Sequence, residues 1–332
     1  MRKITYLAAA TLIAITALTG CGTKNNDTNT TGNNTEVVTD TNNENTNPTS
    51  EPEKTEVVIE HTMGKVTVPV NPKKAVVFDY GVLDTINALN IDTELAVSVE
   101  SLPAYLSEYS NNVNVGSLKE PDLEAIFDFE PEVIFISGRQ ASYYDQLSEI
   151  APTVYVELNS ATYMEDFKKN VGFIAEIFNV EEAANAKIAE IEQQAADVKA
   201  IADTKEEKAL ILLTNDGSIS VYGKGSRFGI IHDLLGVKAA DENIEASTHG
   251  QEANYEYIAK TNPDIIFVVD RTIVVGGTTT ANTVLDNDLV NGTNAAKNDR
   301  IVSLDPDIWY LSGGGIKSVS EMIEVVGEAI NK

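Results

Sequence analysis

The amino-acid sequence predicts an α/β protein of two related lobes, each built on a mostly parallel sheet, joined by one long linking helix. Three observations lead to this fold class. Short apolar runs of strand character alternate with helical stretches along most of the chain. One pattern of residues occurs twice, at a constant offset of 132 positions, as from Leu123 to Tyr255. A segment with helical periodicity and no Gly or Pro, residues 181–203, separates the two copies.

The first 20 residues have the composition of a signal peptide. Two basic residues precede a mostly apolar run, Tyr6 to Leu18, which is too short to span a bilayer comfortably. The run leads into Leu18-Thr19-Gly20-Cys21, which matches the lipobox of bacterial lipoproteins, where the cysteine is acylated and becomes the first mature residue. We therefore expect residues 1–20 to be removed and Cys21 to anchor the protein by lipid to the extracytoplasmic face of the cell membrane, as on a Gram-positive cell surface. A secreted protein with one chance cysteine is the alternative.

Residues 21–55 are rich in Asn, Thr, Glu and Asp and hold almost no large apolar side chains. Such a composition cannot offset the entropy of ordering a backbone. We expect a disordered tether with an end-to-end reach of about 30 Å, enough to hold a folded body off the membrane.

The folded body begins with two short strands around the Met63-Gly64 turn, and further strand-like runs follow. Helical stretches lie between most of these runs, which favours parallel pairing. The expected strands are residues 57–59, 65–69, 75–78, 133–136, 154–156, 209–213, 265–269 and 301–304.

The repeated pattern joins a helix to a following strand in each half of the chain. In the first half it reads Leu123-Glu124-Ala125-Ile126 and then Pro131-Glu132-Val133-Ile134-Phe135. In the second half, Tyr255-Glu256-Tyr257-Ile258 is followed at the same spacing by Pro263-Asp264-Ile265-Ile266-Phe267. The repeat predicts two related, Rossmann-like lobes, which we place at residues 56–180 and 204–332.

Residues 181–203 are expected to form one linking helix between these lobes. At 1.5 Å per residue it would be about 35 Å long. A helix is a stiff connection, so we expect little closure of the lobes. Apolar residues recur on one face at three- and four-residue spacing, and they are Ile188, Ile191, Ala195, Val198 and Ile201.

Composition narrows the function. The 332 residues include 24 basic and 51 acidic side chains, a net charge of −27, which argues against nucleic-acid binding because that requires a basic face. Cys21 is the only cysteine, which excludes an intrachain disulfide, a cysteine zinc cluster and a CxxC redox pair. No nucleophile elbow, HExxH motif or convincing pair of catalytic carboxylates is present.

Arginine is scarce in this chain, so its placement is informative. Arg139 and Arg271 follow equivalent strands of the repeat, and Arg227 lies in a glycine-rich stretch before an apolar helical run, Ile230 to Leu235. Ligands of open α/β sheets bind at the carboxyl ends of the strands, so we expect these three side chains in one cleft. Guanidinium groups stay charged and donate in planar forks, so the three together predict an anion site. Arg300, which precedes a strand, is expected to take no part in it.

His249 differs from the other two histidines. His61 and His232 are expected to be structural, whereas His249 lies in a loop where nothing apolar explains it. Tyr310 belongs to an aromatic pair on another strand-exit loop, ahead of three consecutive glycines. An imidazole and a phenolate could complete the shell of a ferric ion whose other positions are filled by an oxygen chelator.

Together these features resemble the helix-linked substrate-binding proteins of iron-siderophore ABC importers. The resemblance covers roughly residues 55–330 and rests on the lipobox, the tether, the repeat, the linking helix and the stretch Asp307-Ile308-Trp309-Tyr310-Leu311-Ser312-Gly313-Gly314-Gly315. Within this family the chain is similar to the catecholate binders, which take up ferric petrobactin, enterobactin hydrolysis products or catecholamine complexes.

The resemblance implies roles for five residues of the cleft. Arg139, Arg227 and Arg271 match the arginine triad that holds catecholates. His249 and Tyr310 match a His and a Tyr that the binders of tetradentate catecholates add as ligands of the ferric ion.

The resemblance also implies a partner. Glu124 and Glu256 match the residues, one per lobe, that dock on arginines of the permease dimer. Their equivalence in the repeat fits a two-fold symmetric partner, although an ordinary acid at a helix N-terminus would also account for each of them.

The expected function is non-enzymatic capture of ferric catecholate siderophores, tris or bis, between the lobes and their delivery to an ABC importer. A ferric ion with three catecholates has a charge of −3, which three arginines match, and a bis-catecholate has a charge of −1 and leaves two coordination sites open. No permanently bound cofactor is expected, and the protein is expected to be a monomer. Two alternatives remain open: a heme or cobalamin-type binding protein of the same fold, and a hydrolase of the chelator ester that uses Ser226 or His249.

Overall fold

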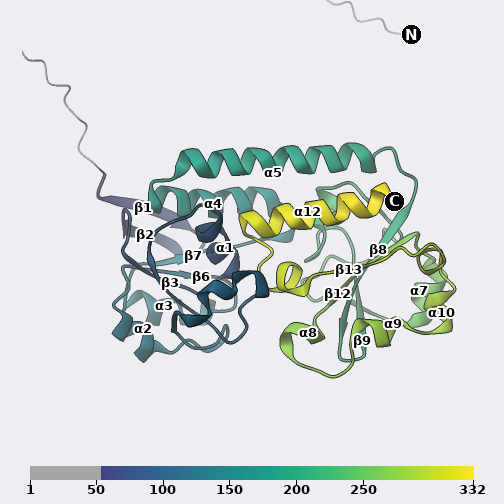
Figure 1. The fold of residues 1–332 in the computed structure, drawn as a ribbon, viewed down its shortest axis with the longest axis horizontal. Helices are drawn as coiled ribbons and strands as arrows, with labels where there is room; N and C mark the ends of the chain where they lie inside the picture. The colour runs from purple at the N-terminus through teal and green to yellow at the C-terminus, as the bar shows by residue number, and fades with distance from the viewer. Residues whose placement is uncertain (1–53) are drawn as a thin grey trace, which may run out of the picture. The chain divides into compact units, whose positions relative to one another are not determined.

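Two α/β lobes with a long helix between them, α5 (Glu181–Ala202), make up the part of the chain that the computed structural model describes, residues 54–332 (Figure 1). These residues belong to one compact unit. The expected signal peptide, the lipidation site at Cys21 and almost the whole tether lie outside the described residues. No helix within residues 54–332 is long and apolar enough to cross a membrane.

The N-terminal lobe is built on a parallel sheet of five strands and an antiparallel hairpin. Its strands are β1 (Glu56–His61), β2 (Gly64–Pro69), β3 (Lys74–Val77), β4 (Glu94–Val97), β5 (Val113–Asn114), β6 (Val133–Ile136) and β7 (Thr153–Tyr155). The first two pair as the hairpin, and the sheet order is β5-β4-β3-β6-β7. The order reverses between β3 and β6, so their carboxyl ends flank a switch point of the kind at which α/β proteins bind ligands.

Short helices and turns cover this sheet. They are α1 (Tyr80–Ala88), a 3-10 segment (Ala104–Asn111), α2 (Leu123–Phe129), a 3-10 turn (Ala141–Tyr143), α3 (Tyr144–Ser148), a second 3-10 turn (Ser160–Thr162) and α4 (Tyr163–Phe178). The sheet strands β3 and β6 are almost wholly apolar and buried, as expected for a sheet covered on both faces.

The C-terminal lobe repeats this plan with a mixed sheet. Its strands are β8 (Lys208–Asn215), β9 (Ser218–Tyr222), β10 (Lys238–Ala239), β11 (Gln251–Ala253), β12 (Ile265–Asp270) and β13 (Ile301–Leu304). They are ordered β11-β9-β8-β12-β13, with β10 beside the start of β8. The strand β9 runs antiparallel to β8 because Asp216 and Gly217, both at positive φ, make a tight turn between them. The sequence did not predict β9, nor the short strands β4, β5, β10 and β11.

Eight helical elements complete the C-terminal lobe. They are α6 (Ile230–Asp233), α7 (Tyr255–Thr261), α8 (Thr272–Val275), α9 (Ala281–Leu285), α10 (Asp288–Asn291), α11 (Asn294–Lys297), a π-helical turn (Asp307–Leu311) and α12 (Ile316–Asn331). The helix expected over Ile230 to Leu235 is therefore shorter than the apolar run indicated.

The repeat is confirmed in the fold. Helices α2 and α7 each span seven residues at the predicted offset. The Asp122 carboxylate caps the first helix and the Asn254 side chain caps the second, each by accepting from the backbone N–H three residues on. Both helices end at a left-handed residue, Glu130 and Asn262, and lead into the central strands β6 and β12. Two related lobes therefore follow from one repeated unit.

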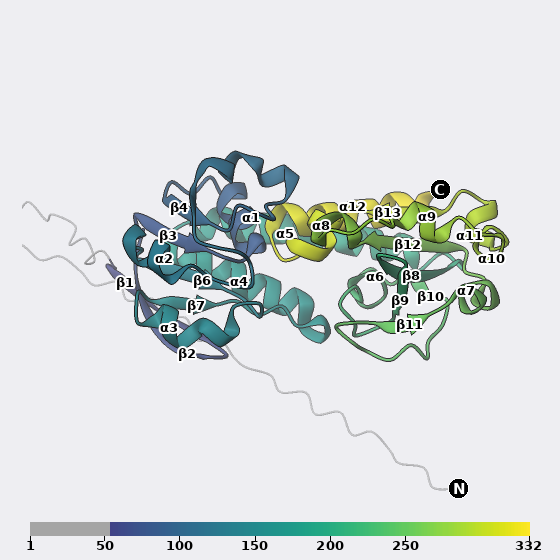
Figure 2. The same ribbon diagram turned by 90° about the horizontal axis from the view of Figure 1, so that it is seen from below.

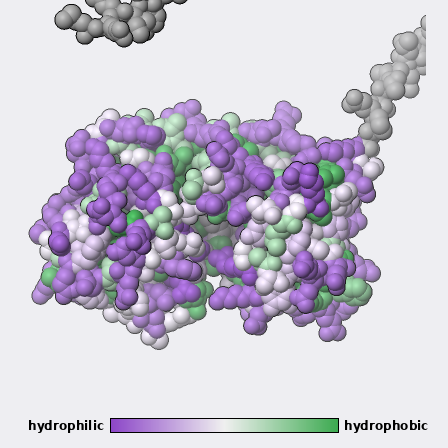
Figure 3. All heavy atoms as spheres, turned by 180° about the vertical axis from the view of Figure 1, so that it is seen from behind, coloured by the Kyte–Doolittle hydropathy of each residue, from purple (hydrophilic) through white to green (hydrophobic). Residues whose placement is uncertain are grey.

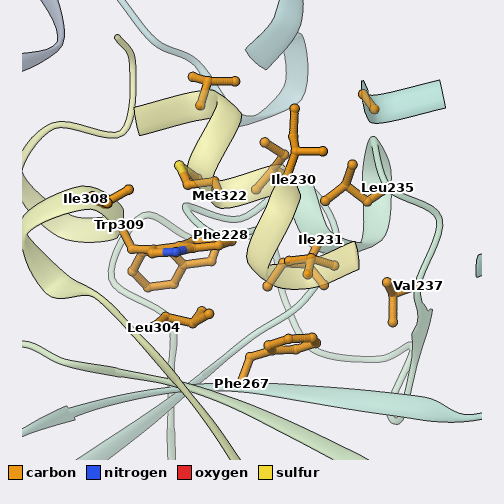
Figure 4. Packing of buried hydrophobic residues seen from close by; sticks show 14 of the residues in the cluster. Phe228, Ile230, Ile231, Leu235, Val237, Phe267, Leu304, Ile308, Trp309 and Met322 are labelled. Atoms are coloured by element: carbon orange, nitrogen blue, oxygen red, sulfur yellow. The ribbon is translucent and has the colours of Figure 1, made fainter. Parts of the chain in front are cut away.

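The linking helix α5 is about 33 Å long at 1.5 Å per residue. Its residues Ile191 and Ala195 are buried, and the other apolar positions of the predicted face pack against the same core. Helix α12 packs beside it, and Figure 1 shows α5 running across from one lobe to the other. Figure 2 shows the two lobes side by side, seen from below. One apolar core continues from α4 through these two helices to the sheet of the C-terminal lobe. Figure 4 shows the part of it around Phe228, Phe267 and Trp309.

Candidate ligand-binding cleft

A cavity of about 750 Å³ lies between the two lobes. The surface is indented there in the view from behind (Figure 3). Its walls come from the loops that follow β3, β6 and β7 in the N-terminal lobe, and from Gly225, Arg227 and residues 246–249 and 309–314 in the C-terminal lobe. The N-terminal wall also carries the carboxylates Asp79 and Glu157. The volume falls in the range of small-molecule sites, which are roughly 300–1,000 Å³.

Arg139 is placed by the turn that follows β6. The neighbouring Gln140 is fully buried, and its side chain accepts from the backbone N–H of Ser137 and donates to the carbonyl of Leu118. These two bonds fix the turn. The Arg139 guanidinium lines the cavity and donates to the carbonyl oxygen of Tyr310, 3.0 Å away.

Arg227 reaches the same carbonyl from the other lobe. Its guanidinium donates to the Tyr310 carbonyl oxygen at 2.6 Å and lies over the Tyr310 ring, 4.2 Å from the ring centroid. The turn that carries it is held by the Asp233 carboxylate, which accepts from the backbone N–H of Gly225 at 2.6 Å. Gly225 has a φ of +65°, which favours glycine at that point of the turn.

Arg271 meets Tyr310 from behind rather than from the cavity. It follows β12, and its Nε donates to the Tyr310 hydroxyl at 2.7 Å. Its NH1 donates to the side-chain oxygen of Asn215 at 2.6 Å. Arg139 and Arg227 line the cavity but Arg271 does not, so the expectation that all three open directly into one cleft holds for two of them. Asn215, at the end of β8, was not predicted as a site residue.

The three arginines therefore converge on one residue, and within residues 54–332 no carboxylate forms an ion pair with any of them. Arg300 behaves as expected and lies elsewhere, paired with Glu207 at 3.2 Å. Burial lowers the pKa of the Arg227 guanidinium, and the positive charges of Arg139 and Arg271 lower it further. Among the described residues no carboxylate is paired with this concentration of positive charge, although the chain has 51 acidic residues.

The same arginines change the acidity of Tyr310. Burial of the phenol acts to raise its pKa, but the hydrogen bond from Arg271 and the charges of the three arginines outweigh burial and lower it. Phenolate is the form that donates to a ferric ion. The arginines therefore favour the ionised form of a half-buried tyrosine beside the cavity.

His249 lies on the cavity wall in an exposed loop. The Tyr222 hydroxyl donates to its backbone carbonyl at 3.0 Å, and the neighbouring Ser247 carbonyl accepts from the backbone N–H of Arg227 at 3.4 Å. These bonds place the loop next to the turn that carries Arg227. Among residues 54–332, no group of three or more His, Cys, Asp or Glu side chains could hold a metal ion.

The aromatic pair lies in a helical turn and not in an open loop. Residues 307–311 form one π-helical turn, which directs the neighbours Trp309 and Tyr310 differently. Trp309 is only 4% exposed and packs edge-on against Phe228, with ring centroids 6.3 Å apart (Figure 4). It still forms part of the cavity wall.

The other two histidines are structural, as predicted. His61 is buried, and its Nε2 lies 3.2 Å from the Thr153 carbonyl. His232 is buried with its Nδ1 2.8 Å from the Val237 carbonyl. Burial lowers the pKa of both imidazoles.

Glu124 and Glu256 occupy matching exposed positions. Each is the second residue of its helix, Glu124 in α2 and Glu256 in α7. Both side chains are exposed. The fold thus presents one such carboxylate on each lobe.

Two Rossmann-like lobes joined by a helix, with an arginine-rich cavity between them, define the class of helix-linked solute-binding proteins. The chain belongs to the periplasmic binding protein family (Peripla_BP_2), whose profile matches residues 76–308. It is accordingly a binding protein and not an enzyme. The family and fold that the sequence resemblance implied are confirmed.

Several relatives share nearly the whole chain. The petrobactin-binding protein YclQ of Bacillus subtilis (strain 168) is 44% identical over 288 residues, which cover 85% of this chain and 91% of the relative. Its crystal structure superimposes with a TM-score of 0.82 at 43% identity, over 84% of this chain and all of that one. The ferric-anguibactin-binding protein FatB of Vibrio anguillarum is 33% identical over 82% of this chain and 87% of its own length. The catecholate-siderophore binding protein VctP of Vibrio cholerae has a TM-score of 0.76 at 32% identity, over 82% of this chain and 99% of that one.

Proposed function

We propose that this protein is the binding component of an iron-siderophore ABC importer and that it captures ferric catecholate complexes in the cavity between its lobes. One observation carries the proposal: Arg139, Arg227 and Arg271 converge on Tyr310 without a carboxylate partner among the described residues. A cluster of like charges at a half-buried site is stabilised by an anion that enters it. The relatives named above bind petrobactin, ferric anguibactin and a catecholate siderophore, which supports a siderophore as that anion.

The charge of the ligand follows from the charge of the cluster. A ferric tris-catecholate carries −3 and spreads this charge over six oxygens, which suits forked guanidinium donors approaching from two lobes. The net charge of −27 opposes an anionic ligand at long range, but salt screens charges beyond about 8–10 Å. The electrostatic potential at the cavity is therefore set mainly by the three nearby arginines. Arg271 acts here through Tyr310, and it would contact the ligand only after the Tyr310 hydroxyl turns to the metal.

His249 and Tyr310 supply the two ligands that a tetradentate bis-catecholate leaves vacant. Both line the cavity, and the lowered pKa of Tyr310 reduces the work of removing its proton. The iron would arrive with its chelator, as cargo of the site, so no resident cofactor is part of the proposal.

The partners and location are proposed from the same resemblance. Glu124 and Glu256 would dock on the two halves of the permease, one from each lobe. Cys21 would carry the lipid that anchors a monomeric protein on the extracytoplasmic face of the membrane, after removal of residues 1–20. Residues 21–55 would be the tether, residues 56–180 and 204–332 the two lobes, and residues 181–203 the linker.

Intrinsic fluorescence tests the proposed ligand class. Ferric catecholate complexes absorb light, so a complex bound in the cavity should quench Trp309, whose ring forms part of the wall. We expect saturable quenching at micromolar concentrations by ferric bis- and tris-catecholates. The controls are the iron-free chelators, a neutral ferric trihydroxamate, heme and cobalamin, each corrected for inner-filter absorption. Saturable quenching by heme or cobalamin, with none by the ferric catecholates, would show that the ligand class is wrong.

A further inference from the structure

The segment that carries Tyr310 belongs to the C-terminal lobe in sequence, but the N-terminal lobe holds it in place. Residues 307–318 follow β13 and so continue the C-terminal lobe. Their polar contacts nevertheless reach into the N-terminal lobe. The Asp307 carboxylate accepts from the backbone N–H of Ala104 at 2.8 Å, and the Tyr105 hydroxyl donates to Ser312 Oγ at 2.8 Å. Tyr163, at the start of α4, donates to the carbonyl of Gly313.

Asp84 makes the most specific of these contacts. It lies in the middle of α1 and is only 1% exposed. One carboxylate oxygen accepts from the backbone N–H of Lys317 at 3.1 Å, and the other accepts from that of Ser318 at 2.7 Å. These two N–H groups belong to the first turn of α12, where a helix has no internal acceptors for its donors. The Tyr105 hydroxyl lies 3.4 Å from the second oxygen and so joins Asp84 to Ser312.

Helix α12 needs this external carboxylate because its own N-cap residue is Gly315, which has no side chain to accept a hydrogen bond. The glycine is required for the approach. A Cβ atom at Gly315 would lie 2.2 Å from the nearer oxygen of Asp84, and a Cβ at Gly81 would lie 2.8 Å from the Gly314 carbonyl carbon. Gly315 and Gly81 therefore let the segment close on α1, and Asp84 replaces the missing cap from the other lobe.

We propose that Asp84 is a positioning residue that fixes residues 307–318 to the N-terminal lobe and thereby holds Tyr310 between the arginines of the two lobes. Tyr310 lies two residues before Ser312, and its carbonyl accepts from Arg139 of one lobe and Arg227 of the other. Any shift of the segment relative to α1 therefore changes the spacing of these guanidiniums. The effect on ligand affinity rests on the proposed function, whereas the effect on the segment does not.

The electrostatic state of Asp84 fits such a role. Burial raises the pKa of its carboxyl, against the hydrogen bonds from Ser318 and Lys317 and the charge of the Lys317 ammonium, which lower it. Burial of a carboxylate is unfavourable unless its oxygen atoms accept hydrogen bonds. A carboxylate kept at this depth by backbone donors of the opposite lobe makes a rigid connection between the lobes besides α5.

Asp84→Asn tests the proposal, because the amide keeps the shape but its oxygen can accept from only one of the two N–H groups of α12, and its NH2 group faces the other. Peptide-resolved hydrogen exchange of the ligand-free full chain should show at least tenfold faster exchange over residues 307–312 as well as at 317–318. Affinity for a ferric tris-catecholate, measured by fluorescence quenching, should fall at least tenfold. The matched control is Thr153→Val, which removes a buried hydroxyl of the same lobe whose one hydrogen bond within residues 54–332 goes to the Ala151 carbonyl. It should leave both readouts unchanged.

The possible outcomes separate the two claims. Faster exchange limited to residues 317–318, with unchanged affinity, would make Asp84 a helix cap only and overturn the proposal. If the wild-type protein bound no ferric catecholate, the proposed function would fail, and exchange over residues 307–312 would still decide the positioning role. Should Asp84→Asn not fold, Tyr105→Phe and Ser312→Ala remove the bridge between Asp84 and the segment. Both should then show the same pattern at smaller amplitude, and unchanged exchange in both would refute the role.

Discussion

Replacement of Arg227 by alanine should weaken ferric tris-catecholate binding by about 1–3 kcal/mol for each charged hydrogen bond that is lost, or roughly 5- to 150-fold in Kd. Arg227 is the arginine that both lines the cavity and lies over the Tyr310 ring, so its removal takes away a donor and the cation next to the phenol. Arg271→Ala should weaken binding as well, through Tyr310. Fluorescence titration or calorimetry with the purified protein measures both effects.

Matched variants and ligands show whether charge is the cause. Arg227→Lys keeps the charge and loses the planar fork, so it should recover part of the affinity. Arg300→Lys changes an arginine outside the cavity and should leave affinity unchanged. The loss of affinity caused by Arg227→Ala should be smaller for a ligand of charge −1 than for a ligand of charge −3. Unaltered affinity in both Arg227→Ala and Arg271→Ala would show that these arginines do not form an anion site.

The second large effect concerns His249 and Tyr310. If they ligate the ferric ion, a tetradentate bis-catecholate should gain a phenolate-to-iron charge-transfer band on binding, and Tyr310→Phe should abolish it because that ring has no oxygen. The combined change His249→Ala with Tyr310→Phe should weaken the tetradentate complex far more than a hexadentate tris-catecholate, which has no vacant coordination site. Absorption spectra and titrations with the two ligand classes give both readouts. Equal losses without a spectral change would mean that the side chains only line the cleft.

The pH dependence follows from the same tyrosine. Because Arg271 and the charge of the cluster lower the Tyr310 pKa, the phenolate forms at a lower pH in the folded protein than in a free tyrosine. The phenol must lose its proton to bind iron, so affinity for the tetradentate complex should fall as pH decreases through that lowered pKa. In Arg271→Ala the pKa should rise, and the decline should begin at a higher pH. A hexadentate ligand should lack this dependence on Tyr310.

The parts of this molecule that were predictable are those encoded by local or repeated patterns. The 132-residue repeat predicted helices α2 and α7 and the strands after them, and the uninterrupted periodicity of residues 181–203 predicted α5. Strands β9 and β11 were missed because they pair antiparallel inside an otherwise parallel lobe, β9 with β8 through a tight turn and β11 with β9 after a long connection. Alternation of strands and helices led us to expect parallel pairing. The tight turn between β8 and β9 makes this pair antiparallel instead.

The site was predictable as a set of residues but not as a geometry. The scarcity of arginine pointed to Arg139, Arg227 and Arg271, yet nothing in the sequence indicates that Arg271 sits behind Tyr310 and contacts Asn215. Asp84 was not identifiable either. Its partners are the backbone N–H groups of Lys317 and Ser318, more than 230 positions away, and backbone donors leave no trace in side-chain composition.

A crystal structure of the protein with a ferric tris-catecholate would show directly whether the cavity between the lobes is the ligand site. We expect the iron in the cavity between the lobes, with guanidinium nitrogens of Arg139 and Arg227 within hydrogen-bonding distance of catecholate oxygens and the two lobes at nearly their present spacing. Iron located outside this cavity, or a bound complex that neither arginine contacts, would contradict this expectation.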